Sequence, residues 1–242
     1  MKNNTNWKKP HLPAEDYKSN WDWCVDHSEY HFTDKKDEVG DWFDIIGTFD
    51  GDWHDDLEKF KKESTPINWE TRQFYAGSDD ISPMLEQEEY DIIKGGGDPK
   101  KLQLCNKVTD FSDYPQLTKM IDFLGLEGGD DEFKARGHMQ YTGQMFNMHI
   151  DKLWDQCPED PERVARFIIF LDDWHPGQFL MYGNLFHEWS AGEVVTFDWP
   201  NVPHATANAS NHPRPALVIT GLKSDKTREL LANPGKHNVF KV

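Results

Sequence analysis

The feature that most constrains the fold is a series of short apolar runs between residues 137 and 222. Each run is rich in β-branched or aromatic residues, which are typical of strands, and turn residues separate the runs. The six runs read GHMQYTGQMFNMHI, RFIIFLDDW, GQFLMYGN, GEVVTFDW, HATANAS and RPALVITGL. So many short strands, preceded by helices, predict two packed sheets or a barrel. We therefore expect a mainly β fold with flanking α, a double-stranded β-helix (jelly roll) with N-terminal helices packed on it.

Helices are expected on both sides of this segment. The run SPMLEQEEYDIIKGGG begins with a capping Ser82 and ends in glycines, which predicts a helix over 83–94. In SDYPQLTKMIDFLGLEGG the apolar residues recur every three or four positions, which predicts an amphipathic helix capped by Asp113. DDLEKFKKES predicts a further short helix, and SDKTRELLAN predicts a C-terminal helix capped by Ser224.

The chain length suits one large domain, because 242 residues lie within the range of single all-β barrels and sandwiches. Six of the ten tryptophans lie in the acidic N-terminal region. Since disordered tails rarely hold so many tryptophans, we expect this region to wrap the core with aromatic anchors. The predicted parts are an acidic, Trp-rich region (1–80), helical support (81–136), a jelly-roll core (137–222) and a C-terminal helix and tail (223–242).

The charge balance argues against nucleic acid as a partner. Forty-three acidic and 26 basic side chains give a formal charge of −17, and no Lys/Arg cluster supplies the basic face that sequence-independent binding requires. No apolar run is long enough to cross a bilayer and no secretory signal begins the sequence, so we expect no membrane association and a cytoplasmic location. The three cysteines, odd in number and without CxxC spacing, suit reduced thiols. The oligomeric state stays open.

A histidine and a carboxylate stand one residue apart at the end of the first apolar run. On an extended strand, residues i and i+2 point to the same side, so His149 and Asp151 can bind one ion. His204 opens a later run, and a jelly roll can bring it beside this pair. Two histidines and one carboxylate form the facial triad that holds non-haem Fe(II) and leaves the opposite face open. The same three ligands with a water could instead hold a catalytic zinc ion.

A basic residue at the start of the next run bears on this choice. Arg214 lies ten positions beyond His204, where it would face the same barrel interior. A buried guanidinium with no acidic partner in its own strand fits a bidentate clamp on a dicarboxylic acid. This favours an oxygenase over two alternatives, a zinc-dependent hydrolase and a cupin-like β-barrel that binds without turnover.

Other residues capable of chemistry are interpreted as structural. His54 and Asp56 repeat the HxD spacing, but they lie where a loop leads into a helix, so solvated charge is the simple explanation. Arg166 is expected to form a salt bridge at the start of a strand. The predicted loops hold three histidines expected at the surface and three tryptophans expected at the barrel mouth, namely His175, His187, His212, Trp154, Trp174 and Trp189.

The order of HxD, distal histidine and a basic residue ten positions later resembles the Fe(II)/2-oxoglutarate-dependent oxygenases. YTGQMFNMHID followed by RFIIFLDDW is most similar to the prolyl 4-hydroxylase-type branch of that superfamily. The resemblance covers about residues 137–222 and does not reach the N-terminal region. Two features depart from that branch: the short gap from Tyr141 to His149, and Asp173 where oxygen-sensing members carry a second co-substrate tyrosine. Prolyl specificity therefore does not follow from the resemblance.

The resemblance implies a role for each matching residue. His149, Asp151 and His204 match the iron ligands at the catalytic centre. Arg214 matches the residue that pairs with the distal carboxylate of 2-oxoglutarate, and Tyr141 matches a tyrosine that donates a hydrogen bond to the same co-substrate. The implied cofactors are Fe(II), 2-oxoglutarate and O2, with ascorbate in support. The implied reaction is hydroxylation of a protein or peptide side chain such as proline, or of a free amino acid or small metabolite, with release of succinate and CO2.

Overall fold

The computed structural model describes residues 43–64 and 106–242, apart from residues 130, 152 and 184. The helix predicted over 83–94 and most of the Trp-rich region 1–80 lie outside these residues. Among the helices of the described ranges, none has the length and apolar character needed to cross a membrane.

The strands and helices occur in the following chain order: β1 (Phe43–Asp50), α2 (His54–Glu63), β2 (Asn106–Val108), α4 (Pro115–Phe123), β3 (Leu126–Glu127), β4 (Lys134–Gln140), β5 (Met145–His149), β6 (Val164–Phe170), β7 (Gln178–Tyr182), β8 (Leu185–Phe186), β9 (Glu193–Phe197), β10 (His204–Asn208), β11 (Arg214–Lys223), α5 (Asp225–Ala232) and β12 (Val239–Lys241). Two 3₁₀ helices connect β5 to β6, at Leu153–Asp155 and Pro161–Arg163.

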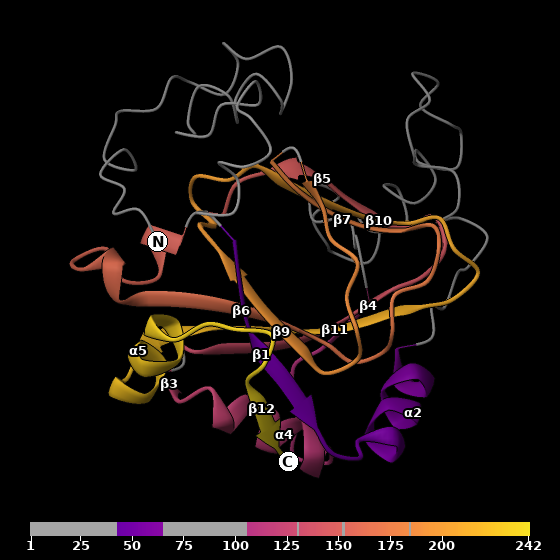
Figure 1. Cartoon of the computed structure of the whole chain (residues 1–242), viewed down its shortest axis with the longest axis horizontal. Helices are drawn as coiled ribbons and strands as arrows, with labels where there is room; N and C mark the ends of the chain where they lie inside the picture. The colour runs from indigo at the N-terminus through magenta and orange to yellow at the C-terminus, as the bar shows by residue number, and fades with distance from the viewer. Residues whose placement is uncertain (1–42, 65–105, 130, 152, 184) are drawn as a thin grey trace, which may run out of the picture.

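The strands form two sheets that face each other as a jelly roll (Figure 1). The large sheet has the order β12-β1-β9-β6-β11-β4-β2, with β3 paired to β11, and the small sheet has the order β5-β10-β7-β8. From β4 to β11 the chain passes back and forth between the two sheets, with β7 and β8 as one antiparallel hairpin. This alternation is the double-stranded β-helix, so the predicted fold class is confirmed.

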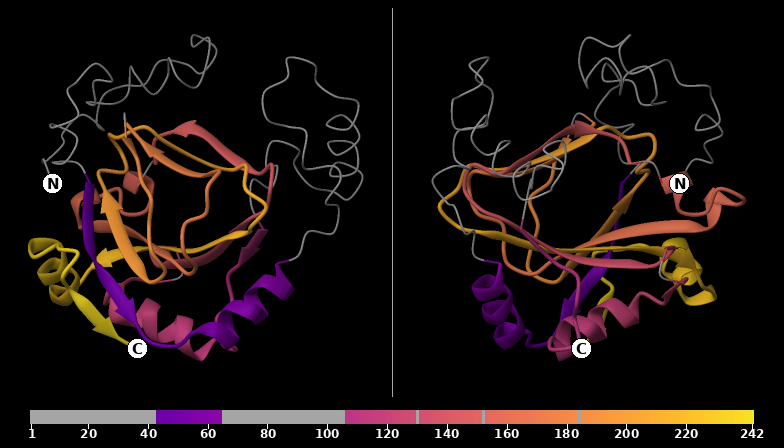
Figure 2. Two further views of the ribbon diagram at one scale, coloured as in Figure 1. Left: turned by 45° about the vertical axis from the view of Figure 1, so that its right-hand side comes forward. Right: turned by 180° about the vertical axis from the view of Figure 1, so that it is seen from behind.

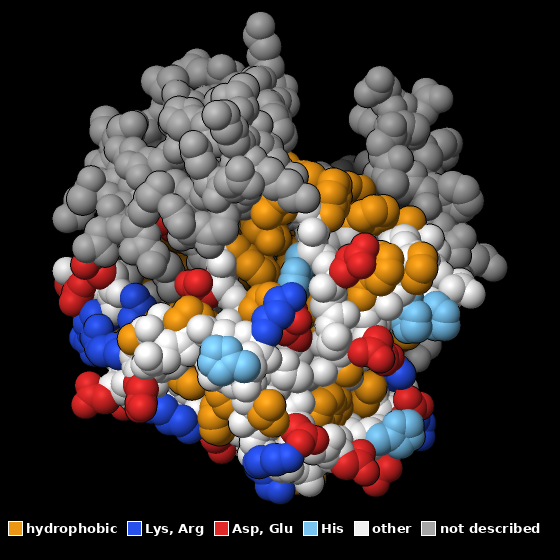
Figure 3. All heavy atoms as spheres, viewed as in Figure 1, with side chains coloured by type: hydrophobic (Ala, Val, Ile, Leu, Met, Phe, Trp, Pro, Cys, Tyr) orange, Lys and Arg blue, Asp and Glu red, His pale blue; other side chains and the backbone are white. Residues whose placement is uncertain are grey.

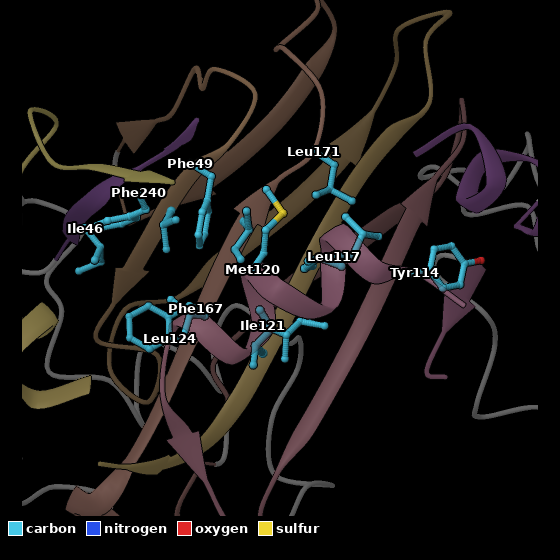
Figure 4. Close-up of a cluster of buried hydrophobic side chains, with 14 of the residues drawn as sticks. Ile46, Phe49, Tyr114, Leu117, Met120, Ile121, Leu124, Phe167, Leu171 and Phe240 are labelled. Atoms are coloured by element: carbon cyan, nitrogen blue, oxygen red, sulfur yellow. The ribbon is translucent and has the colours of Figure 1, made fainter. Parts of the chain in front are cut away.

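Each face of the large sheet is covered. The helices α2 and α4 lie on the face that points away from the small sheet (Figure 2). There Leu117 and Met120 of α4 join Leu217 and Ile219 of β11 in one buried cluster, called here the outer core (Figure 4). The alternate residues of β11 point the other way, and Ala216 belongs to a second cluster between the sheets, called here the inner core. Burial on both faces explains the nearly continuous apolar runs of β6 and β11.

Four strands of the large sheet, β1, β2, β3 and β12, were not expected from the sequence. The strand β1 pairs antiparallel with β9 and parallel with β12 near the C-terminus. Ile46 and Phe49 of β1 enter the outer core together with Phe240 of β12. At Gly47 a Cβ atom would come within 2.5 Å of the Phe240 ring, so only glycine permits this approach of the two strands. The described part of the N-terminal region therefore contributes the strand β1 and the helix α2.

The first apolar run is divided into β4 and β5, although the sequence suggested one strand. The chain turns between Tyr141 and Gln144, where the Gln144 amide donates to the Tyr141 carbonyl at 3.0 Å. Gly143 has a φ of 85°, a left-handed conformation that favours glycine, and its amide donates to the Asn208 carbonyl at 2.7 Å. The turn carries the chain from the large sheet to the small sheet and so places His149 opposite β10.

The cap of α4 comes from a distant residue. Asp113 was predicted to cap this helix, but Tyr114 occupies the N-cap position and makes no capping hydrogen bond with its side chain. Instead Asp56 of α2 accepts hydrogen bonds from the amides of Gln116 at 2.7 Å and Leu117 at 3.0 Å. Asp56 is buried, so its interpretation as a solvated charge was wrong. The carboxylate satisfies two amides that a helix N-terminus leaves without partners.

The C-terminal helix matches its prediction. Ser224 is the N-cap of α5, and its Oγ accepts a hydrogen bond from the Thr227 amide at 3.2 Å.

On the face of the molecule drawn in Figure 3, the described acidic and basic side chains are interspersed rather than gathered by sign.

Candidate metal centre

Three side chains converge where the small sheet meets the chain that leaves it. His149 is the last residue of β5, and its Cα partner in the antiparallel pairing is His204, the first residue of β10. Asp151 follows two residues after His149. Its carboxylate oxygens lie 3.7 Å from His149 Nε2 and 3.6 Å from His204 Nε2. One ligand atom from each residue falls within 4.8 Å of the others, so a single ion could contact all three.

The orientation of His204 suits metal binding. Its Nδ1 lies 3.0 Å from the Val202 carbonyl, which can only accept, so Nδ1 carries a proton and Nε2 is the nitrogen left to bind a metal ion. Trp199 stands edge-on to the ring, with the two ring centroids 5.1 Å apart. His204 is buried, and these contacts fix the ring with Nε2 turned toward Asp151.

The carboxylate of Asp151 is held by a guanidinium. Arg166 of β6 donates a hydrogen bond from Nη1 to Asp151 Oδ2, and the Asp151 amide donates to the Trp199 carbonyl at 3.0 Å. Burial raises the pKa of Asp151. The Arg166 guanidinium and the two histidine rings outweigh burial and hold this pKa well below its usual value. Asp151 is therefore ionised and can act as a metal ligand near neutral pH.

Arg214 lies in the interior between the two sheets. It is the first residue of β11 and is 4% exposed. It alternates along the strand with Ala216 of the inner core, so its side chain starts from the face that looks toward the small sheet. Its neighbour Gln140 donates to Thr206 Oγ1 at 2.9 Å, and Thr206 is two residues beyond His204 on β10. Arg214 and the three candidate metal ligands therefore lie in the same space between the two sheets.

A tryptophan supports this arginine. The Arg214 guanidinium lies over the Trp189 ring, with its Cζ 5.6 Å from the ring centroid. Trp189 in turn stacks on Phe170, with the ring centroids 4.2 Å apart. Trp189 is buried in the inner core, so its predicted place at the barrel mouth was wrong.

Tyr141 is not directed into this interior. Its hydroxyl donates to the Lys61 carbonyl of α2 at 3.2 Å, and its ring packs against the outer core. This hydrogen bond lies on the helical side of the large sheet, so the structure does not bring the Tyr141 hydroxyl to the co-substrate site that the resemblance implied.

The three histidines that were expected at the surface, His175, His187 and His212, differ in their surroundings. His187 was expected at the surface, but it is buried and its Nε2 pairs with Glu193 Oε1. His212 is exposed, as expected, and its ring stacks on that of His175 with centroids 3.9 Å apart. Neither arrangement involves the three converging ligands.

Sequence reasoning missed the partner of Arg166. A salt bridge was expected for this residue, but not one with a candidate metal ligand. The available signal was its position two residues before Ile168, on the inward face of a strand whose alternate residues are apolar. A charged residue on a buried face requires a charged or hydrogen-bonding partner, and the carboxylate of the HxD pair was the available one.

An open cleft of about 540 Å³ lies elsewhere, between α4 and the first residues of β4. Phe111, Ile121 and Phe133 are among its lining residues, and none of the three candidate ligands is. The cleft is therefore separate from the candidate metal centre.

Comparison with known proteins found distant structural likenesses. No protein-family model and no curated protein matches the chain. Among solved structures, a prolyl-4-hydroxylase from Pseudomonas putida aligns with 20% identity and a TM-score of 0.34, over 58% of this chain and 84% of that one. A protein from Photorhabdus luminescens aligns with 9% identity and a TM-score of 0.29, over 44% of this chain and 75% of that one.

A cupin-superfamily sugar phosphate isomerase from Silicibacter pomeroyi aligns with 12% identity and a TM-score of 0.29, over 38% of this chain and about half, 52%, of that one. TM-scores this low carry no argument. The fold assignment rests on the order of strands in the two sheets.

Proposed function

We propose that this protein is a non-haem Fe(II)- and 2-oxoglutarate-dependent oxygenase that hydroxylates a peptide side chain or a small metabolite and releases succinate and CO2. The observation that carries the proposal is the convergence of His149, Asp151 and His204 inside a jelly roll, with Asp151 ionised. Two imidazoles and one carboxylate are the donor set of the facial triad.

The donor set fits iron in its chemistry as well as in its number. His204 turns Nε2 toward the carboxylate of Asp151, and the ionised Asp151 supplies one negative charge. Three protein ligands would leave three positions of an octahedral ion for the co-substrate and oxygen. A bound Fe(II) would supply oxygen activation coupled to the oxidative decarboxylation of a 2-oxo acid.

Arg214 is the proposed clamp for the distal carboxylate of 2-oxoglutarate. Its guanidinium is buried and is stacked over Trp189, which restricts its rotation. A planar guanidinium can pair with a carboxylate through two parallel hydrogen bonds, and burial strengthens that pair by excluding water. A hydrolase that holds zinc and water has no dicarboxylic co-substrate for this arginine to bind.

The direct test is anaerobic titration with Fe(II) and 2-oxoglutarate, followed by exposure to oxygen. We expect a weak visible charge-transfer band and then oxygen-dependent succinate, both lost in His204→Ala. His212→Ala is the matched control, because His212 is an exposed histidine outside the cluster. Absence of the band and of succinate from the wild-type protein would refute the proposal. Hydrolysis that requires Zn(II) and the same three ligands would favour the zinc alternative.

The substrate can be identified by measuring the same product, succinate. Succinate release can be screened over proline-containing peptides, free amino acids and small metabolites, with His204→Ala as the blank. A substrate should raise succinate release above the uncoupled rate, and Arg214→Leu should raise the KM for 2-oxoglutarate, because the clamp for its distal carboxylate is removed.

A further inference from the structure

Arg166 makes contacts on three sides within the interior. Its Nη1 donates to Asp151 Oδ2, and its Nε donates to Thr220 Oγ1 at 2.7 Å. Its guanidinium also lies over the Trp199 ring, with Cζ 5.5 Å from the ring centroid. Arg166, Thr220 and Asp151 thus form a chain of contacts from β11, through β6, to the segment that follows β5.

The backbone of Arg166 is fixed by the same neighbours. Its carbonyl accepts hydrogen bonds from Thr196 Oγ1 at 2.7 Å and from Trp199 Nε1 at 2.9 Å. The Trp199 carbonyl accepts from the Asp151 amide at 3.0 Å. The main chain of Asp151 is therefore held by Trp199 and its side chain by Arg166, and these two residues are hydrogen-bonded to each other. The carboxylate consequently has little freedom to rotate.

The two carboxylate oxygens have different surroundings. Oδ2 accepts a hydrogen bond from Arg166 and lies 3.6 Å from His204 Nε2, whereas Oδ1 lies 3.7 Å from His149 Nε2. An oxygen that accepts a charge-assisted hydrogen bond is a weaker metal donor than its free neighbour.

We infer that Arg166 is a positioning residue of the metal centre: by holding Oδ2, it makes Asp151 bind the ion through Oδ1 alone. This inference rests on the proposed metal centre and extends it to a residue that touches neither metal nor substrate. One-oxygen binding keeps a coordination position open that a two-oxygen carboxylate would fill.

The two donors of Arg166 explain why a lysine would not serve. A guanidinium reaches Thr220 and Asp151 at once through nitrogens in a fixed plane, whereas an ammonium is a single point charge on a flexible stem. Arg166→Lys therefore keeps the charge beside Asp151 and loses the fixed geometry. Thr220→Val removes the hydroxyl that steadies Arg166 while leaving the ion pair in place.

The experiment is anaerobic titration with Co(II) alone, read by the dissociation constant and by the visible d–d spectrum. Co(II) reports its coordination number, because added ligands weaken these bands. We expect Arg166→Ala to weaken Co(II) binding by about 10- to 100-fold, the usual effect of losing a partner of a metal ligand. Arg166→Lys should weaken it less and change the spectrum toward higher coordination, and Thr220→Val should change it in the same direction.

Arg163→Ala is the matched control, because Arg163 is exposed and lies three residues earlier. It should bind Co(II) like the wild-type protein, and His149→Ala should give no site spectrum. If near-UV circular dichroism shows that Arg166→Ala does not fold, the inference is tested with Arg166→Lys and Thr220→Val alone. The inference would be overturned if Arg166→Lys and Thr220→Val kept the wild-type Co(II) dissociation constant and spectrum. It would also be overturned if Arg166→Ala bound Co(II) more tightly than the wild-type protein.

The outcome is separable from the proposed function. Wild-type protein that binds Co(II) with the expected Arg166 dependence, yet releases no succinate, would leave the positioning role intact and refute the oxygenase. If the protein releases succinate but its Co(II) spectrum does not change in the Arg166 and Thr220 variants, the oxygenase is supported and the positioning role is refuted.

Discussion

At the scale of single residues, the interior combines charges whose partners are close and specific. Asp151 pairs with Arg166, and His187 pairs with Glu193. Buried charges are costly unless they are paired and hydrogen-bonded, so each of these side chains depends on its partner. The first pair belongs to the candidate metal centre, whereas the second offers a test of stability that leaves the metal ligands untouched.

The His187 pair predicts a measurable loss of stability. Glu193→Ala should lower the free energy of unfolding by about 1–3 kcal/mol, because it leaves His187 Nε2 buried without its acceptor. Urea denaturation would measure the change. Glu188→Ala changes an exposed glutamate nearby and should shift stability by less than about 0.5 kcal/mol. Equal stability of the two variants would show that the pair contributes nothing.

At the scale of elements, residues distant in sequence set where helices and strands begin. The carboxylate of Asp56 caps α4, so α2 and α4 are joined by hydrogen bonds as well as by the outer core. Asp56→Ala should cost about 1–2 kcal/mol, the upper range for a lost N-cap. The neighbouring Asp55→Ala removes an exposed acid from the same turn and should be nearly neutral, and thermal unfolding of both variants distinguishes them.

The turn between β4 and β5 gives a second prediction at this scale. Gly143→Ala should destabilise the protein by about 1–2 kcal/mol, because a residue with a Cβ is strained in the left-handed region. Since this turn leads into the strand that ends at His149, Co(II) affinity should fall as well. Gly129→Ala is the control, because no atom lies within 4 Å of the added Cβ position. Unchanged Co(II) affinity in Gly143→Ala would show that the turn does not set the position of His149.

The same elements explain what the sequence could and could not predict. The spacing of His149 and Asp151 follows from strand geometry, and the apolar runs of β6 and β11 reveal their own burial. The cap of α4 and the partner of Arg166 were not predictable from local pattern, because each joins residues on different elements. The strand β1 was missed because its parallel partner β12 lies at the other end of the chain, and the two strands become recognisable only as a pair.

At the scale of the whole molecule, the candidate metal centre joins the two sheets. His149 and His204 belong to the small sheet, and Asp151 is tied through Arg166 to the large sheet. An ion bound by all three would therefore connect the two sheets directly. Metal binding and the stability of the folded chain should be coupled, because the unfolded chain does not assemble the site.

This coupling predicts stabilisation by a divalent ion. At a free Co(II) concentration one hundred times its dissociation constant, the folded state should gain about 2.7 kcal/mol. The unfolding temperature should rise with Co(II) concentration for the wild-type protein and stay constant for His149→Ala. A rise of equal size in both proteins would mean that the stabilising ion binds elsewhere.

The ion pair of Asp151 also has a consequence for how the protein is made. Arg166 follows Asp151 by 15 residues, so a growing chain on the ribosome acquires the counter-charge for this carboxylate soon after the carboxylate itself. His204 emerges much later, with β10, and only then is the donor set complete. Neutralisation of the aspartate therefore needs no metal ion, because Arg166 already supplies a positive charge beside it.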